Sequence, residues 1–148
     1  MTTIACTLTE MSADTAVVNS GPLYHADKIF RIGLSLYGTA GDSYMCLAFI
    51  EWLKSAKRSP QALQKQIAIE HRDEIAVMEL RPGGIYLWNG WGIAERIHEK
   101  YYAIGSGSMV AIHALARGES TSDAIRAAMK WDENTDAPIQ TEKLKRKR

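Results

Sequence analysis

Alternating apolar and polar positions recur along the chain, and this is the pattern of half-buried β-strands. Residues 2–7 alternate and are rich in β-branched side chains, so they predict a strand. The same reasoning predicts eight further strands, over residues 11–18, 28–32, 34–37, 74–80, 85–88, 93–97, 101–104 and 137–144. Short turn signals such as Asn89-Gly90 separate several of them, which indicates antiparallel hairpins.

Helical signals replace the alternation in four segments. After a small-residue loop over residues 38–41, Asp42 is a suitable N-cap for a helix whose apolar stripe includes Met45, Phe49 and Leu53. Ser59-Pro60 predicts the start of a short second helix. Residues 109–117 predict a helix that Gly118 ends, and a further helix follows from Ser120 or Thr121 to about Trp131.

The order of elements is strands, helices, strands, helices and a final strand. This order differs from the strict strand–helix alternation of a doubly wound parallel sheet. It predicts an α+β fold in which two mainly antiparallel sheets pack together with helices outside. We expect one domain over residues 1–142, followed by a basic tail over residues 143–148.

Amino-acid composition and the distribution of charge exclude some classes of protein. The chain is 46% hydrophobic and 24% charged, as in globular proteins, and no apolar run is long enough to span a bilayer. Five of the 18 basic residues lie in the last six positions, so the rest of the chain carries 13 basic and 17 acidic groups, a net charge of −4. This distribution does not favour a nucleic-acid binder. With no secretory signal and only Cys6 and Cys46, we expect a cytoplasmic protein.

Most candidate motifs are explained by a structural role and do not indicate a catalytic or ligand-binding site. The Gly105-Ser106-Gly107-Ser108 segment precedes a helix, but it lacks the Lys-Ser or Lys-Thr pair of a phosphate loop. The four histidines are scattered and show no metal-ligand spacing. Cys6 and Cys46 are expected to be buried, and no metal or organic cofactor is predicted.

The N-terminus offers a more specific possibility. Thr2 follows Met1, and threonine is small enough for methionine aminopeptidase to remove Met1. Thr2 would then have a free α-amine, which titrates at about 7.7–8.0 in model peptides, and a hydroxyl on the same residue. One residue can therefore supply both the nucleophile and its general base.

Several segments, in order, resemble the proteasome β-subunit and HslV-like family of N-terminal nucleophile (Ntn) hydrolases. The likeness covers nearly the whole chain. It rests on Thr2-Thr3-Ile4, Ser12-Ala13-Asp14, Lys28-Ile29-Phe30-Arg31-Ile32, Gly38-Thr39-Ala40-Gly41-Asp42, Ala103-Ile104-Gly105-Ser106-Gly107-Ser108 and Asp132-Glu133-Asn134-Thr135. The turn between the first two strands is about four residues shorter than is usual in that family.

The resemblance implies a role for each of four residues at the reaction centre. Thr2 would be the nucleophile and, through its amine, the base. Lys28 would lower the pKa of the Thr2 groups and stabilise developing negative charge, and Asp14 would hold Lys28 charged and oriented. The amide of Gly38 would donate to the oxyanion of the tetrahedral intermediate.

Three further residues would support the nucleophile. By the same resemblance, Ser106, Asp132 and Thr135 would lie near the Thr2 amine and fix its position and protonation.

The resemblance also implies the architecture and the activity. The fold would be a four-layer αββα sandwich, and the activity that of a threonine-type endopeptidase, conditional on removal of Met1. Substrates would be peptides or unfolded proteins, and partners would be further copies of the chain in homo-oligomeric rings, with a possible ATPase unfoldase. Two alternatives stay open at this stage: a catalytically silent assembly protein with this fold, and an amidase acting on a small molecule.

Overall fold

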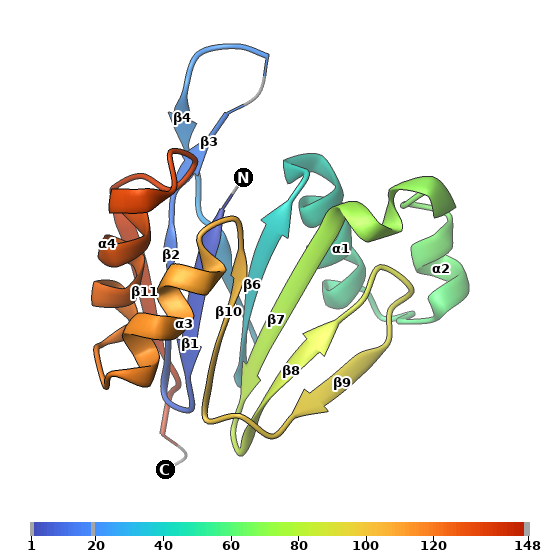
Figure 1. Cartoon of the computed structure of the whole chain (residues 1–148). Helices are drawn as coiled ribbons and strands as arrows, with labels where there is room; N and C mark the ends of the chain where they lie inside the picture. The colour runs from blue at the N-terminus through green and yellow to red at the C-terminus, as the bar shows by residue number, and fades with distance from the viewer. Residues whose placement is uncertain (1, 19, 147–148) are drawn as a thin grey trace.

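Two antiparallel β-sheets lie face to face in the computed structural model, which describes residues 2–18 and 20–146 (Figure 1). The four-stranded sheet has the order β10 (Tyr101–Gly105), β1 (Thr3–Thr7), β2 (Glu10–Asp14) and β11 (Ile139–Lys143). The five-stranded sheet has the order β5 (Ile29–Ile32), β6 (Ser35–Gly41), β7 (Ile75–Arg81), β8 (Gly84–Trp88) and β9 (Ala94–Ile97). A separate two-stranded hairpin, β3 (Ala16–Val17) and β4 (Tyr24–His25), extends beyond the sheets near the N-terminus.

Helices cover the outer face of each sheet. The helices α3 (Ser108–Ala116) and α4 (Thr121–Trp131) pack on the four-stranded sheet, and α1 (Ser43–Lys54) packs on the five-stranded sheet with α2 (Pro60–Gln64) beside it. A short 3-10 helix, η1 (Ile69–Glu74), leads into β7. The predicted four-layer αββα sandwich is therefore confirmed.

Local sequence explains where the helices begin. The side chains of Asp42, Ser59 and Ser120 each accept a hydrogen bond from a backbone N–H in the first turn of the helix that follows. Pro60 occupies the first turn of α2, where its missing N–H costs nothing. All three caps were predicted from the sequence.

Alternation in β1 divides its side chains between two cores. Ile4 and Cys6 are buried between the sheets, whereas Ala5 faces α3 and α4. The layer between the sheets is apolar throughout most of its length. It contains Ile4, Cys6, Met11, Ala13, Ile29, Leu36, Ala40, Met78, Leu80, Ile85 and Ile104.

The structure corrects two local predictions. Residues 38–41 form the second half of β6 rather than a loop, because β7 pairs with them as far as Gly41 opposite Ile75. The basic tail begins later than residue 143: Lys143 pairs with Glu10, and the amide of Leu144 donates to the carbonyl of Thr9 at 2.9 Å. None of the described helices is long and apolar enough to cross a membrane.

Candidate active site

Thr2 is fixed at the beginning of β1, where it is only 5% exposed. Its carbonyl accepts a hydrogen bond of 2.8 Å from the amide of Ser106, in the loop between β10 and α3. Gly105 has a positive φ of 96°, and a Cβ atom there would overlap the carbonyl oxygen of Thr2. The glycine thus lets the loop approach residue 2 closely, and the contact holds residue 2 in place.

Asp14 and Lys28 form a buried ion pair beside the start of β1. Lys28 Nζ donates to Asp14 Oδ2 at 3.0 Å and to the carbonyl of Ala16 at 2.6 Å. The other carboxylate oxygen of Asp14 accepts from the amide of Thr3 at 2.9 Å. An ammonium group has three N–H donors, so one remains after these two bonds. Lys28 and Thr2 line the same pocket, and that pocket is where the third donor can act.

Burial opposes both charges of this pair. It raises the pKa of Asp14 and lowers the pKa of Lys28, and in each case the attraction of the partner offsets part of the shift. A lysine whose pKa is lowered donates a hydrogen bond or a proton more readily than an exposed lysine. The predicted contact between Asp14 and Lys28 is thus present in the structure.

A second polar cluster joins the β10–α3 loop to the segment after α4. Asp132 Oδ2 accepts from Ser106 Oγ and, at 2.6 Å, from Thr135 Oγ1. Because the hydroxyl proton of Thr135 is engaged with Asp132, Thr3 Oγ1 is the donor in the 2.6 Å contact between Thr3 and Thr135. Thr3 Oγ1 in turn accepts from the amide of Gly107 at 3.0 Å. The cluster therefore connects to β1 through Thr3, a residue to which the sequence analysis gave no separate role.

Gly38 is the one predicted site residue that lies elsewhere. It sits inside β6, with Ile29 and Met78 opposite it on the neighbouring strands. A Cβ atom at Gly38 would lie 2.7 Å from Ile4 Cγ2 and 2.8 Å from Met11 Sδ, in the layer between the sheets. Gly38 is therefore needed for close packing of the two sheets, and it is not among the residues that line the pocket beside Thr2.

Gly41, three residues later, does line the pocket. It lies opposite Ile75 in β7, and the next amide, that of Asp42, donates to the carbonyl of Glu74 at 3.3 Å. In this register Gly41 belongs to a pair that exchanges no backbone hydrogen bonds, so its amide points away from β7. On the side of β6 away from β7 lies the pocket that both Gly41 and Lys28 line.

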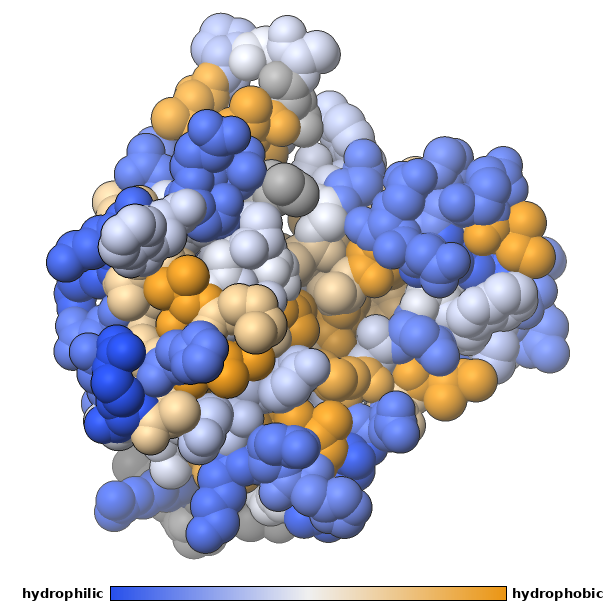
Figure 2. Space-filling model, in the orientation of Figure 1, coloured by the Kyte–Doolittle hydropathy of each residue, from blue (hydrophilic) through white to orange (hydrophobic). Residues whose placement is uncertain are grey.

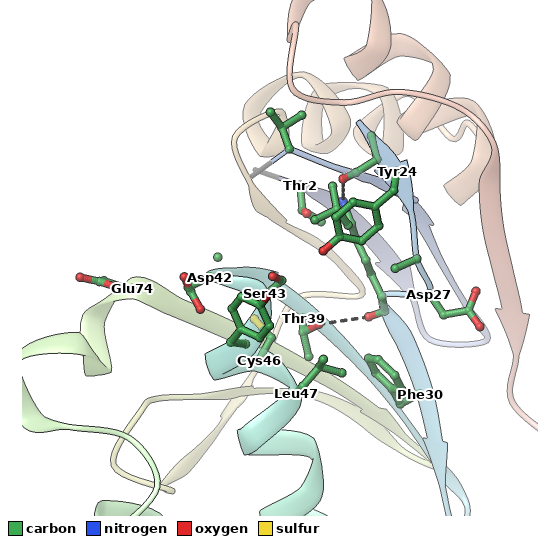
Figure 3. A pocket seen from close by; sticks show the side chains of 17 residues that line it. Thr2, Tyr24, Asp27, Phe30, Thr39, Asp42, Ser43, Cys46, Leu47 and Glu74 are labelled. Atoms are coloured by element: carbon green, nitrogen blue, oxygen red, sulfur yellow. Dashed lines mark hydrogen bonds between the residues drawn. The ribbon is translucent and has the colours of Figure 1, made fainter. Parts of the chain in front are cut away.

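The pocket itself is about 550 Å³ in volume and opens between the β3–β4 hairpin, β5 and the start of α1. Figure 3 shows Thr2 on one side of it and Ser43, Cys46 and Leu47 of α1 on the other. Its walls are mostly apolar, with Ala16, Val17, Val18, Tyr24, Phe30, Cys46 and Leu47 among the lining residues. Cys46 was expected to be buried, which is confirmed, but its place in the pocket wall was missed. Burial raises the pKa of its thiol to about 11, so it is not a nucleophile at neutral pH.

Solved structures with the same architecture cover nearly all of the chain. BPH from Thiobacillus denitrificans, solved in complex with epoxomicin, superposes with a TM-score of 0.73 at 19% identity, over 98% of this chain and 99% of that one. Eukaryotic HslV from Trypanosoma brucei gives a TM-score of 0.68 at 19% identity, over 97% and 99%. Anbu from Hyphomicrobium sp. strain MC1 gives 0.71 at 12% identity, over 97% and 82%.

The chain has the fold of the proteasome-like Ntn hydrolases. Comparison with protein-family models gives no match, and neither does comparison with curated protein sequences. At identities of 12–19%, these similarities establish the fold, and the chemistry must be argued from the residues themselves.

Within this proteasome-like fold, six of the seven predicted site residues lie around the start of β1. Asp14 and Lys28 form one cluster, and Ser106, Asp132 and Thr135 form the other. Thr2 is linked to the second cluster by the hydrogen bond from the Ser106 amide to its carbonyl. Its neighbour Thr3 contacts both clusters, through Asp14 and through Thr135. Met1 lies outside the described residues. Within the part of the chain that is described, no group of three or more acidic, histidine or cysteine side chains is arranged to hold a metal ion.

Asp132 gives the second cluster a testable pH dependence. Burial opposes its charge, but hydrogen bonds from Ser106, Thr135 and Asn134 outweigh burial and hold its pKa below the ordinary value of 3.8. Because the pKa is lower in the folded state, this carboxylate stabilises the fold above the ordinary value and the stabilisation is lost as the pH falls through the folded pKa. Asp132→Asn should therefore lower the melting temperature at pH 7 and have a smaller effect at pH 3, because the contribution of the carboxylate shrinks as the pH falls below 3.8.

The exposed neighbour Glu133 provides the matched control for this experiment. Glu133→Gln should change the melting temperature little at either pH, as measured by circular dichroism. An Asp132→Asn protein with the same deficit at pH 3 as at pH 7 would show that the ionised carboxylate is not what stabilises the cluster.

Proposed function

We propose that the protein is a threonine-type peptidase of the proteasome-like class, in which removal of Met1 exposes Thr2 as nucleophile and base. The observation that carries this proposal is the convergence of Thr2, the Lys28–Asp14 pair and the amide of Gly41 on one pocket. These groups match the needs of amide hydrolysis: a nucleophile with its own base, a buried cation and an oxyanion donor.

The mechanism follows from these positions. The Thr2 amine takes the hydroxyl proton as Oγ1 attacks the peptide carbonyl carbon, and the oxyanion that forms accepts a hydrogen bond from the Gly41 amide. Breakage of the C–N bond transfers the proton to the leaving amine and leaves an ester on Thr2. Water then attacks the ester, gives a proton to the Thr2 amine, and the acid product leaves as the proton returns to Oγ1.

Lys28 and Asp14 act electrostatically in both steps. The positive charge of Lys28 lowers the pKa of the nearby Thr2 groups and stabilises the negative charge that develops on oxygen. Asp14 keeps Lys28 charged in a buried position and, through its bond to the Thr3 amide, fixes β1 relative to the lysine. The apolar walls of the pocket favour a substrate with an apolar side chain next to the bond that is cleaved.

Exposed apolar side chains around the pocket support the proposal that the enzyme is an oligomer. Tyr44 and Leu47, at the start of α1, are 75% and 50% exposed, and Val18 and Leu23 in and beside the β3–β4 hairpin are 57% and 50% exposed. Exposed apolar groups around a peptide-binding pocket are typical of an interface. By resemblance to proteasome-like proteins we expect homo-oligomeric rings, with an ATPase unfoldase as a possible partner.

Assembly gives a prediction that is independent of chemistry. Static light scattering at micromolar concentration should report a homo-oligomer rather than a chain of 16.5 kDa. Leu47→Glu places a charge in the apolar rim and should shift the protein toward the monomer, whereas Glu51→Gln on the same helix should not. A wild-type protein that is strictly monomeric under these conditions would contradict a chambered peptidase.

A peptidase assay with a covalent inhibitor tests the proposed activity. Protein that has lost Met1 should hydrolyse fluorogenic peptides with an apolar residue before the cleaved bond faster than peptides with an acidic residue there. Because BPH binds epoxomicin, that compound is a suitable inhibitor for this chain too, and it should abolish hydrolysis. Hydrolysis that epoxomicin leaves untouched would argue against the threonine mechanism.

A further inference from the structure

Arg72, in η1, is a buried arginine that has no acidic partner among the residues the structure describes. It is only 5% exposed, and its guanidinium lies 4.1 Å from the ring centre of Trp91. No acidic side chain among the described residues forms an ion pair with it, and its Nε atom is buried without a hydrogen-bond partner. By contrast, Arg31 and Arg81 each form an ion pair with a glutamate.

An arginine in this state is unusual for physical reasons. A buried charge is costly unless a counter-charge and hydrogen bonds compensate for it, and stacking on one indole supplies only part of that compensation. The backbone around Arg72 is nevertheless held firmly, because Gly90 packs so closely on it that a Cβ atom there would overlap the carbonyl of Arg72. The fold therefore holds the backbone of Arg72 in a defined place, while no acidic side chain among the described residues pairs with its guanidinium.

Arg72 lines a second pocket, of about 450 Å³, which lies between the two sheets. The face shown in Figure 2 is hollowed between its two halves, where apolar and neutral surface is exposed. The lining of the second pocket combines the arginine with other polar groups and with aromatic rings. It includes Arg72, Asp73, Trp88, Asn89, Tyr102 and Ser108.

The two pockets are neighbours in the fold. Thr2 lines the first pocket, Gly105 lines the second, and these two residues are in direct contact. Likewise Glu74 borders the first pocket, while its neighbours Asp73 and Ile75 border the second. When the acyl-side residue of a peptide occupies the first pocket, the second pocket is the neighbouring space for its leaving-group side.

We propose that the second pocket binds a carboxylate on the leaving-group side of the peptide substrate, with the Arg72 guanidinium as its counter-charge. The proposal rests on the proposed peptidase function. A carboxylate matches the planar donors of a guanidinium and supplies the counter-charge that Arg72 lacks among the described residues, and Trp88 and Tyr102 line the same pocket. The carboxylate comes either from the C-terminus of a short peptide or from an acidic side chain.

Binding should be measured on a Thr2→Ala background, because that variant cannot consume the ligand and the result then does not depend on peptidase activity. Two matched pairs of probes separate the sources of the carboxylate. The first pair is acetyl-trialanine and its C-terminal amide; the second is acetyl-Ala-Glu-Ala-amide and acetyl-Ala-Gln-Ala-amide. Dissociation constants come from calorimetric titration, and NMR of the arginine Nε–H groups reports directly on Arg72.

We expect the carboxylate member of at least one pair to bind about tenfold more tightly than its amide and to shift the Arg72 Nε–H resonance. Preference in the first pair assigns a C-terminal carboxylate, and preference in the second assigns an acidic side chain. Arg72→Gln should remove the preference. Asp73→Asn, which removes an exposed negative charge from the same pocket, should strengthen it.

Three outcomes would overturn the proposal. The first is equal affinity within both pairs, and the second is a preference that survives Arg72→Gln. The third is an Arg72 Nε–H resonance that does not respond to saturating carboxylate peptide. If Arg72→Gln does not fold, Asp73→Asn and the NMR measurement on the Thr2→Ala protein still test whether Arg72 binds a carboxylate. A peptidase that is inactive but shows the preference would reject the proposed function and leave the carboxylate site standing.

Discussion

Thr2→Ala should abolish peptide hydrolysis while the fold and the assembly persist. The substitution removes the hydroxyl that attacks the carbonyl but keeps a terminal amine once Met1 has been removed. Loss of the nucleophile from another covalent hydrolase costs on the order of 10⁶ in kcat, and we expect a loss that brings hydrolysis to background. A fluorogenic peptide assay measures the loss of hydrolysis. Circular dichroism and light scattering on the same sample show whether the fold and the assembly persist.

Two further proteins make this prediction specific to the N-terminus. Thr2→Ser keeps the hydroxyl and the amine and should retain partial activity. An N-terminal extension that is not cleaved converts the amine to an amide, which cannot accept a proton, and should be as damaging as Thr2→Ala. A nucleophile such as Ser43 or Ser106 would tolerate the extension, so full activity of the extended protein would reject the N-terminal mechanism.

Substitutions in the Asp14–Lys28 pair should have the largest effects on stability. Asp14→Ala leaves the Lys28 ammonium buried without its carboxylate and removes the acceptor of the Thr3 amide. Breaking a buried ion pair in this way costs roughly 3–5 kcal/mol of unfolding free energy. Asp14→Ala combined with Lys28→Met should be more stable than Asp14→Ala alone, because the unpaired charge is then gone. Urea unfolding of the three proteins measures this difference.

Lys28→Met should separate the catalytic role of the lysine from its structural role. Without the lysine, the pKa of the buried Asp14 rises further, because the attraction that opposed desolvation is lost. A carboxyl whose pKa is raised by folding favours the folded state at low pH, so this variant should lose stability as the pH rises above 3.8. Where the variant is folded, loss of the positive charge should raise the barrier to hydrolysis by about 3 kcal/mol. A folded Lys28→Met protein with wild-type kcat/KM would remove Lys28 from the mechanism.

Much of the fold could be predicted because it follows local rules. Alternation marked most of the strands, and Asp42, Ser59-Pro60 and Ser120 marked the helix starts. The resemblance of short segments then placed Asp14 and Lys28 near Thr2, and the structure brings these groups together.

The misinterpretation of residues 38–41 has a physical cause. Small residues and glycines are typical of a loop. Here glycine is required for packing, because a Cβ atom at Gly38 would collide with the layer between the sheets and one at Gly41 would overlap the carbonyl of Glu74. The length of β6 is determined by its pairing with β7, about 35 residues later in the chain, which no local pattern reports. For this reason the sequence analysis assigned the oxyanion donor to Gly38, whereas Gly41, to which we assign that role in the proposed mechanism, is the glycine that lines the pocket.

Arg72 and Cys46 could not be assigned to pockets from the sequence for a related reason. An arginine in a polar segment is expected to be solvated, but in the structure Gly90 packs against its backbone and Trp91 stacks on its guanidinium. Cys46 lies on an apolar helix, and only the position of α1 relative to Thr2 places it in a pocket wall. Both assignments depend on contacts between segments that are distant in the chain.

The central claim is that Thr2, with a free amine, is the nucleophile. The most direct test is the mass of the intact protein, and of its N-terminal peptide, after reaction with a threonine-directed covalent inhibitor. We predict a protein that lacks Met1 and carries one inhibitor on Thr2, and no adduct on Thr2→Ala or on the N-terminally extended protein. An unmodified Thr2 in protein that has lost Met1, or an adduct on any other residue, would contradict the account.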